Sequence, residues 1–193
     1  NIGTDGTFIG NERSDTANTT PDIYLLNKIF NQSLERNINH VVLEASSHGL
    51  IQDRLNGIDF DYGVFTNLST EHLDYHKTMD EYFAAKMILL ENSKKRIVNI
   101  DDPYGKKAKA KFTDAVTFGK EKEADYRATD IVKNEKTTDF KVRGVDFTIN
   151  SIADYEIYNK LAAIATLNNM GASLEEIAEK LRDFKGLPSR FQY

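Results

Sequence analysis

The most informative part of the sequence for the fold is residues 63–100. It begins with the apolar run GVFTNL at 63–68 and ends with RIVNI at 96–100. Short apolar runs rich in β-branched residues predict buried strands. Between them, Thr78-Met79-Asp80-Glu81 fits a capping box, and the apolar residues that follow predict a helix to Leu90. Two strands joined by a helix through short connections predict a parallel α/β sheet.

On the N-terminal side of this stretch we expect a loop, a helix and a further strand. Residues 1–18 are rich in Gly, Thr, Asn and Asp, which favours a loop with one short strand. Thr19-Thr20-Pro21-Asp22 predicts a helix start with Thr20 as the cap, and the helix continues to about Asn37. Residues 40–45 form a short β-branched run that predicts a strand buried on both faces. The apolar face expected for the helix consists of Ile23, Leu26, Ile29, Phe30 and Leu34.

On the C-terminal side the pattern changes from alternating strands and helices to a hairpin and two helices. The elements predicted there are a helix over 104–112, a strand over 115–118, a small antiparallel β subregion over 125–152, and helices over 155–170 and 174–184. Ser173 and Glu176 fit a capping box at the start of the last helix. Together these elements predict an α/β fold with a mostly parallel sheet covered by helices on both faces. The chain length favours a single domain over 1–193.

Composition excludes several classes of protein. The 193 residues include no cysteine, so disulfides, thiolate zinc sites and a cysteine nucleophile are excluded. The formal net charge of −5 argues against a nucleic-acid partner. No apolar run is long enough to span a membrane and no signal peptide is visible. We therefore expect a reduced, soluble, cytoplasmic domain, with a monomer as the default.

Polar residues follow the predicted strand at 40–45. In α/β sheets, ligands bind beyond the carboxyl ends of strands. Glu44 at such an end is a candidate metal ligand, because a carboxylate leaving a buried strand is costly without a cation. The hydroxyl, amide and guanidinium groups from Ser46 to Arg54 suit an anionic substrate. A capped strand-to-helix turn with a surface arginine is the alternative.

A second polar cluster, residues 66–76, contains two histidines. His72 and His76 stand four residues apart, the spacing of a zinc pair on a helix. Leu73 stands where the metalloprotease pattern has Glu, which disfavours hydrolytic zinc. One histidine that helps to hold Mg²⁺ or a phosphate fits better, and a hydrogen-bonded loop histidine remains the alternative. Lys86, alone on its predicted helix, is not singled out by chemistry.

Four stretches, in this order and over nearly the whole chain, resemble the central domain of the Mur ligase family. They are NTTP at 18–21, EASSHGLIQDR at 44–54, FTNLSTEHLDYH at 65–76 with AAK at 84–86, and YNKLAA at 158–163 with GLPSRF at 186–191. The likeness is greatest to the member that adds the third residue to UDP-MurNAc-L-Ala-D-Glu. It implies a P-loop or Rossmann-like fold and an ATP-dependent amide-forming ligase of peptidoglycan precursor synthesis.

The resemblance also implies a role for individual residues. Those implied to bind the UDP-MurNAc-peptide are Asn18, Thr19, Thr20, Ser46, Gln52 and Arg54. Those implied to hold Mg²⁺ beside the ATP phosphates, and to be catalytic, are Glu44, His72 and Lys86, the last as a carbamate. Those implied to contact ATP are Asn67, Asn159 and Arg190.

The chain also departs from the family pattern. The family's phosphate loop with its lysine is expected before Asn1 and the domain that selects the amino acid after Tyr193, and the segment 149–155 is short. We therefore interpret the chain as a partial central domain that does not turn over by itself, and the identity of the added amino acid stays open. The alternatives are a folylpolyglutamate-type or other ligase of the superfamily and a non-catalytic nucleotide-sugar-binding fragment.

Overall fold

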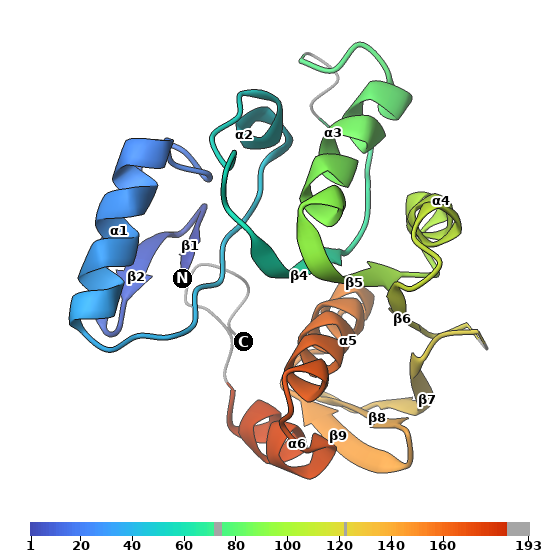
Figure 1. Cartoon of the computed structure of the whole chain (residues 1–193). Coiled ribbons are helices and arrows are strands. Elements are labelled where there is room, and N and C mark those ends of the chain that lie inside the picture. The colour runs from blue at the N-terminus through green and yellow to red at the C-terminus, as the bar shows by residue number, and fades with distance from the viewer. Residues whose placement is uncertain (72–74, 122, 185–193) are drawn as a thin grey trace. The chain divides into compact units, whose positions relative to one another are not determined.

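The contacts of the chain fall into two units, which are described separately. The computed structural model describes residues 1–71, 75–121 and 123–184 (Figure 1). Unit 1 comprises Asn1–Phe60 and Thr70–Asn92, and unit 2 comprises Asp61–Ser69 and Ser93–Tyr193.

Unit 1 begins with a three-stranded antiparallel meander. Its strands are β1 (Ile2–Gly3), β2 (Gly6–Ile9) and β3 (Glu12–Ser14). The expectation of a loop with one short strand was wrong here. Gly6 and Gly10 have φ values of 106° and 63°, and this positive φ, which glycine adopts at little cost, allows tight turns between very short strands.

The strand predicted over 40–45 is largely absent, which is the second correction. Leu43 forms one isolated parallel bridge with Ile2, and Val42 is 70% exposed. In the described part of the chain this segment pairs with β1 alone. A β-branched run indicates strand propensity but does not supply the neighbours that bury a strand on both faces.

Helix α1 (Ile23–Glu35) begins later than its sequence pattern predicts. Its N-cap is Asp22, whose side chain accepts a hydrogen bond from Leu25 N, so Thr20 is not the cap. Leu26 and Ile29 are buried as expected, whereas Leu34 is 67% exposed. Leu34 lies in the last turn of the helix, where the apolar spacing continues but the packing does not.

Two further helices of unit 1 carry or adjoin the candidate site. Helix α2 (Ser47–Ile51) is capped by Ser46, and α3 (Met79–Glu91) is capped by Thr78. The Thr78 cap was predicted, but the Glu81 carboxylate accepts from Lys77 N rather than from the cap residue. The core of unit 1 is formed by Ile2, Ile9, Leu26, Ile29, Leu50 and Leu55.

Unit 2 is built on the six-stranded sheet that the sequence predicts as α/β. In sheet order its strands are β4 (Phe60–Phe65), β5 (Ser93–Asn99), β6 (Val116–Gly119), β7 (Tyr126–Lys133), β8 (Thr138–Val142) and β9 (Val145–Ile149). β5, β6 and β7 are parallel neighbours, and β8 and β9 continue the sheet as an antiparallel hairpin that turns at Gly144. β4 starts three residues before the predicted strand and ends at Phe65.

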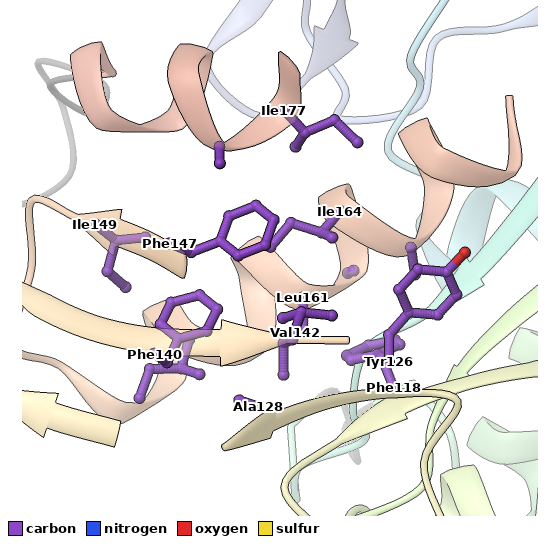
Figure 2. Packing of buried hydrophobic residues seen from close by; sticks show 14 of the residues in the cluster. Phe118, Tyr126, Ala128, Phe140, Val142, Phe147, Ile149, Leu161, Ile164 and Ile177 are labelled. Atoms are coloured by element: carbon purple, nitrogen blue, oxygen red, sulfur yellow. The ribbon is translucent and has the colours of Figure 1, made fainter. Parts of the chain in front are cut away.

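The helices of unit 2 lie where the sequence predicts them, within two residues. They are α4 (Pro103–Lys111), α5 (Asp154–Asn169) and α6 (Leu174–Asp183). Figure 2 shows the core between the sheet and α5 and α6, where Phe140 and Phe147 stack with ring centres 5.7 Å apart. Among the described helices, none has the length and hydropathy needed to cross a membrane.

Candidate active site

The candidate site lies in unit 1, and a single buried hydroxyl organises it. Thr20 Oγ1 donates to Glu44 O at 2.7 Å and accepts from Ser46 N at 2.8 Å. Thr20 is completely buried. Buried backbone groups need partners, and the hydroxyl supplies them for two peptide groups that no strand pairs. Thr20 therefore fixes the segment in which Glu44 and Ser46 stand.

Glu44 is held by the first turn of the chain. Its Oε2 accepts from Thr4 N at 3.0 Å and from Thr4 Oγ1 at 2.8 Å. A Cβ at Gly3 would stand 2.7 Å from Glu44 Cδ, so only glycine leaves room for this carboxylate. Thr4 Oγ1 also lies 3.2 Å from Thr19 Oγ1, which brings Thr19 to the same place. The carboxylate is thus oriented although the residue is exposed.

Two further candidate residues, Ser46 and Arg54, stand on either side of α2 and form hydrogen bonds with Thr20. Ser46 Oγ accepts from Gly49 N at 3.0 Å. Arg54 donates from one guanidinium nitrogen to Thr20 O at 2.8 Å and from the other to Gln52 Oε1 at 2.6 Å. The alternative of a capped turn is correct for Ser46. Arg54, however, is partly buried and oriented rather than a loose surface arginine.

Lys86 reaches the same segment from α3. Its Nζ donates to Ala45 O at 2.9 Å and lies 5.9 Å from the ring centre of Tyr82. Burial lowers the pKa of the Lys86 ammonium, and the charge of Glu44 opposes that shift. A lowered pKa increases the fraction of neutral amine, the form that is nucleophilic. The lysine that chemistry alone could not single out is therefore a partly buried cation that interacts electrostatically with Glu44.

His76 is buried in the interior of unit 1. It is 2% exposed, its Nε2 lies 2.8 Å from Ser47 Oγ, and its ring stacks on Tyr82 at 4.8 Å. Burial and the charge of Glu71 raise the pKa of Tyr82. One ring nitrogen of His76 is thus engaged by a hydroxyl. The other histidine of the predicted pair, His72, lies outside the described residues.

The site contains most, but not all, of the residues singled out in the sequence. Hydrogen bonds within unit 1 connect the segments that carry Thr19, Thr20, Glu44, Ser46, Gln52, Arg54 and Lys86. Asn18 is an exposed residue of the same unit. Asn67 and Asn159 belong to unit 2, where Asn159 Nδ2 donates to Glu156 Oε1 at 3.2 Å. Arg190, like His72, lies outside the described residues.

Sequence reasoning missed Thr4 and Gly49. Thr4 stands 40 residues before the carboxylate it binds, and no local pattern indicates such a pairing. A Cβ at Gly49 would stand 2.8 Å from Thr20 Cβ, so this position needs glycine for close approach. The only signal in the sequence was a glycine inside a short helical turn, which is ambiguous.

The donor set fits a divalent cation under one condition. Within residues 1–71, 75–121 and 123–184, no three His, Cys, Asp or Glu side chains are grouped to hold a metal ion. Glu44 Oε2 is engaged by Thr4 and offers an oriented carboxylate. Lys86 as an ammonium would repel a cation, whereas a carbamate on Nζ would add two oxygen donors of the kind that Mg²⁺ prefers.

Comparison with known proteins shows which family the chain belongs to. Residues 1–167 match the model of the Mur ligase middle domain. The chain is 39% identical over 194 residues to the Clostridium acetobutylicum protein named UDP-N-acetylmuramoyl-L-alanyl-D-glutamate–2,6-diaminopimelate ligase 1, covering 98% of the chain and 40% of that protein. It is also 39% identical to the ligase of that name from Clostridium perfringens, over 94% of the chain and 40% of the relative.

Solved structures agree with the sequence relatives. A structure of a UDP-N-acetylmuramoyl-L-alanyl-D-glutamate–2,6-diaminopimelate ligase matches with a TM-score of 0.85 and 27% identity, over 98% of this chain and 41% of that one. MurF from Acinetobacter baumannii shares the fold, with a TM-score of 0.61 and 21% identity, over 67% of this chain and 30% of that one. The chain spans about 40% of the length of the curated relatives it matches. On the match over residues 1–167 and these relatives, the chain belongs to the Mur ligase middle domain family.

Proposed function

We propose that the protein containing this chain is an ATP-dependent ligase that joins an amino acid to UDP-MurNAc-L-Ala-D-Glu. The curated relatives are named for this acceptor and for 2,6-diaminopimelate, which makes diaminopimelate the first amine to test. In the proposed reaction the substrate carboxylate attacks the γ-phosphate of ATP, which forms an acyl phosphate and ADP. The amine then displaces phosphate from the acyl phosphate and forms the amide.

One observation carries the proposal: Thr20, Glu44 and Lys86, from three separate segments of unit 1, meet at the backbone of residues 44–46. Two anions must approach one another in such a reaction, so oriented donors and cations account for much of the catalysis. Arg54 brings a guanidinium to the same place through Thr20 O, and a guanidinium suits a carboxylate or a phosphate. Thr19, Thr20, Ser46, Gln52 and Arg54, with Asn18, are proposed to bind the muramyl nucleotide.

The proposed metal ligands are Glu44, His72 and the carbamate of Lys86. Bound Mg²⁺ would neutralise the charge of the phosphates and of the attacking carboxylate. Thr4 orients the Glu44 carboxylate, and burial favours the neutral Lys86 amine that carbamylation by carbon dioxide requires. Asn67, Asn159 and Arg190 are proposed to contact ATP.

The decisive experiment is a ligation assay on the full-length protein. It measures ADP release and the amide product with UDP-MurNAc-L-Ala-D-Glu, ATP and a panel of amines that includes diaminopimelate and lysine. We expect product with one amine of the panel. Absence of product with every amine would contradict the proposal, and glutamate addition to a folate would support the folylpolyglutamate-type alternative.

Lys86 gives a sharper test of the same proposal. Lys86→Ala should abolish ligation, because the variant cannot form the carbamate, and a short carboxylic acid added to the assay should restore part of the activity. Lys106→Ala, at an exposed lysine of α4, is the matched control and should retain activity. Near-normal turnover by Lys86→Ala would remove the carbamate from the mechanism.

A further inference from the structure

His76 lies between the two helices of unit 1 that adjoin the candidate site, and the proposed function assigns it no part. Its Nε2 shares a hydrogen bond with Ser47 Oγ at 2.8 Å. Both residues are 2% exposed, so the bond is shielded from water. The hydrogen bond joins His76, two residues before the Thr78 cap of α3, to Ser47, the first residue of α2.

On the side of α2, the hydrogen bond is made by Ser47, which adjoins the turn of Ser46 and Thr20 that is proposed to bind substrate. Ser47 follows Ser46, the cap whose backbone N donates to the Thr20 hydroxyl. Gly49, the third residue of the helix, packs so closely on Thr20 that a Cβ would stand 2.8 Å from Thr20 Cβ. A shift of α2 by a fraction of an ångström would therefore move the Ser46–Thr20 contact.

On the side of α3, the ring of His76 is connected to Lys86 through the ring of Tyr82. The His76 and Tyr82 rings stack with centres 4.8 Å apart and planes 14° apart. Lys86 stands one helical turn after Tyr82, and its Nζ lies 5.9 Å from the centre of the Tyr82 ring. Tyr82 is 7% exposed, so the stack is part of the packed interior. The Tyr82 ring thus lies against both His76 and Lys86.

We infer that His76 is a positioning residue that sets the register between the α2 turn and Lys86 on α3. The inference rests on the proposed function, which places the muramyl nucleotide at the α2 turn and a carbamate on Lys86, so that the distance between them affects catalysis. His76 acts through Ser47 and Tyr82 and is not assigned contact with substrate or metal. Interiors are close-packed and rearrange in steps rather than smoothly, so a lost hydrogen bond at this point displaces the elements it joins.

Substitutions of His76 can distinguish a role in positioning from a role in packing alone. Glutamine can place an amide nitrogen where His76 has Nε2, whereas phenylalanine keeps a flat ring on Tyr82 and loses the hydrogen bond. Ser47→Ala removes the same hydrogen bond from the other side with a loss of one oxygen. Exposed His40 offers a matched control, His40→Phe.

The test is steady-state kinetics of these variants in the full-length protein. Removal of groups that orient metal ligands from outside typically costs about 10- to 100-fold. We expect a loss of this order in kcat/KM for the muramyl nucleotide from His76→Phe and Ser47→Ala. The KM for ATP should change little, His76→Gln should recover most of the loss, and the double variant should be no worse than either single variant. His40→Phe should match the wild type.

Hydrogen–deuterium exchange of the same proteins provides a readout that does not need activity. In His76→Phe and Ser47→Ala, the amides of α2 should exchange faster while those of α1 stay protected. Wild-type kinetics in both variants, or additive losses in the double variant, would overturn the inference and leave the proposed function intact. A wild-type protein without ligase activity would instead refute the proposed function.

Discussion

At the scale of single residues, Thr20 connects three parts of the candidate site. Its hydroxyl serves two backbone groups from a fully buried position, and Arg54 binds its carbonyl oxygen. The sequence favoured Thr20 as a helix cap, a role that belongs to Asp22. Both roles use an oxygen that accepts from a backbone N–H, so local sequence cannot distinguish them.

Substitution of Thr20 should separate the hydroxyl from the shape of the side chain. Thr20→Val keeps the shape but removes the hydrogen bonds to Glu44 O and Ser46 N, which are partly buried, so we expect a total cost of about 1–3 kcal/mol. We expect a lower free energy of unfolding in urea and a higher KM for the muramyl nucleotide. Thr20→Ser keeps the hydroxyl and should lie nearer to the wild type in both. Equal stability of the valine variant would contradict the bridging role.

Gly49 gives a second prediction at this scale. In Gly49→Ala the new methyl group would stand 2.8 Å from Thr20 Cβ and Cγ2, so α2 or Thr20 must move. We expect destabilisation of about 1–3 kcal/mol, the usual cost of overpacking, together with weaker binding of the muramyl nucleotide. Thermal unfolding and calorimetry measure the two effects. An unchanged melting temperature and an unchanged affinity would show that the turn accommodates the methyl group without cost.

At the scale of elements, the closing helix α6 shows how far local signals suffice. Ser173 accepts from Glu176 N, and the Glu176 carboxylate accepts from Ser173 N, so the capping box predicted from four residues is present. These hydrogen bonds lower the pKa of Glu176. Every atom involved lies within one helical turn, so the local sequence is sufficient to predict these hydrogen bonds.

The capping box of α6 carries a prediction about pH. Ser173→Ala should destabilise unit 2 by about 1 kcal/mol, since the helix loses its N-cap. A lowered carboxyl pKa stabilises the fold above the ordinary glutamate pKa, and this contribution is lost as the pH falls through the folded-state pKa. The stability gap between Glu176→Gln and the wild type should therefore shrink from pH 7 to pH 3. A gap that widens toward acid would contradict the hydrogen-bond assignment.

The hairpin β8–β9 and the segment 40–45 show opposite outcomes of the same kind of reasoning. The hairpin was predicted from alternating polarity around Gly144, and its partners follow one another in sequence. The segment 40–45 also contains β-branched residues but needs neighbours that are distant in sequence. In the described part of the chain it has Ile2 alone.

At the scale of the whole molecule, the candidate residues divide between the two units. Those proposed for the muramyl nucleotide stand in unit 1, and the described residues proposed for ATP, Asn67 and Asn159, stand in unit 2. Arg54→Ala should therefore raise the KM for the muramyl nucleotide in the full-length protein and leave the KM for ATP nearly unchanged. Loss of affinity for ATP alone would contradict this assignment.

Asn159→Ala should give the reverse pattern, with a higher KM for ATP and an unchanged KM for the muramyl nucleotide. Its amide also donates to Glu156 on the same helix, an exposed contact whose loss should leave the melting temperature nearly unchanged. Equal effects on both substrates would show that the two units do not divide the ligands in this way.

Local sequence patterns were sufficient to predict the α/β class, the helices α4, α5 and α6, the hairpin at Gly144 and the caps at Thr78 and Ser173. Each of these depends on side-chain periodicity or on groups within one turn, and such signals are complete in a short window of sequence. Family motifs, rather than chemistry, pointed to Lys86.

The assembly of the candidate site depends on contacts between distant segments, which local sequence does not predict. Thr4 orients Glu44, Thr20 bridges residues 44 and 46, and Lys86 reaches Ala45 from α3. These partners stand 24 to 41 residues apart in the sequence. Burial of an amine beside a carboxylate, and close approach of Gly49 to Thr20, arise from packing between segments. No local pattern encodes such contacts, because their energy depends on which distant groups the fold brings within hydrogen-bonding distance.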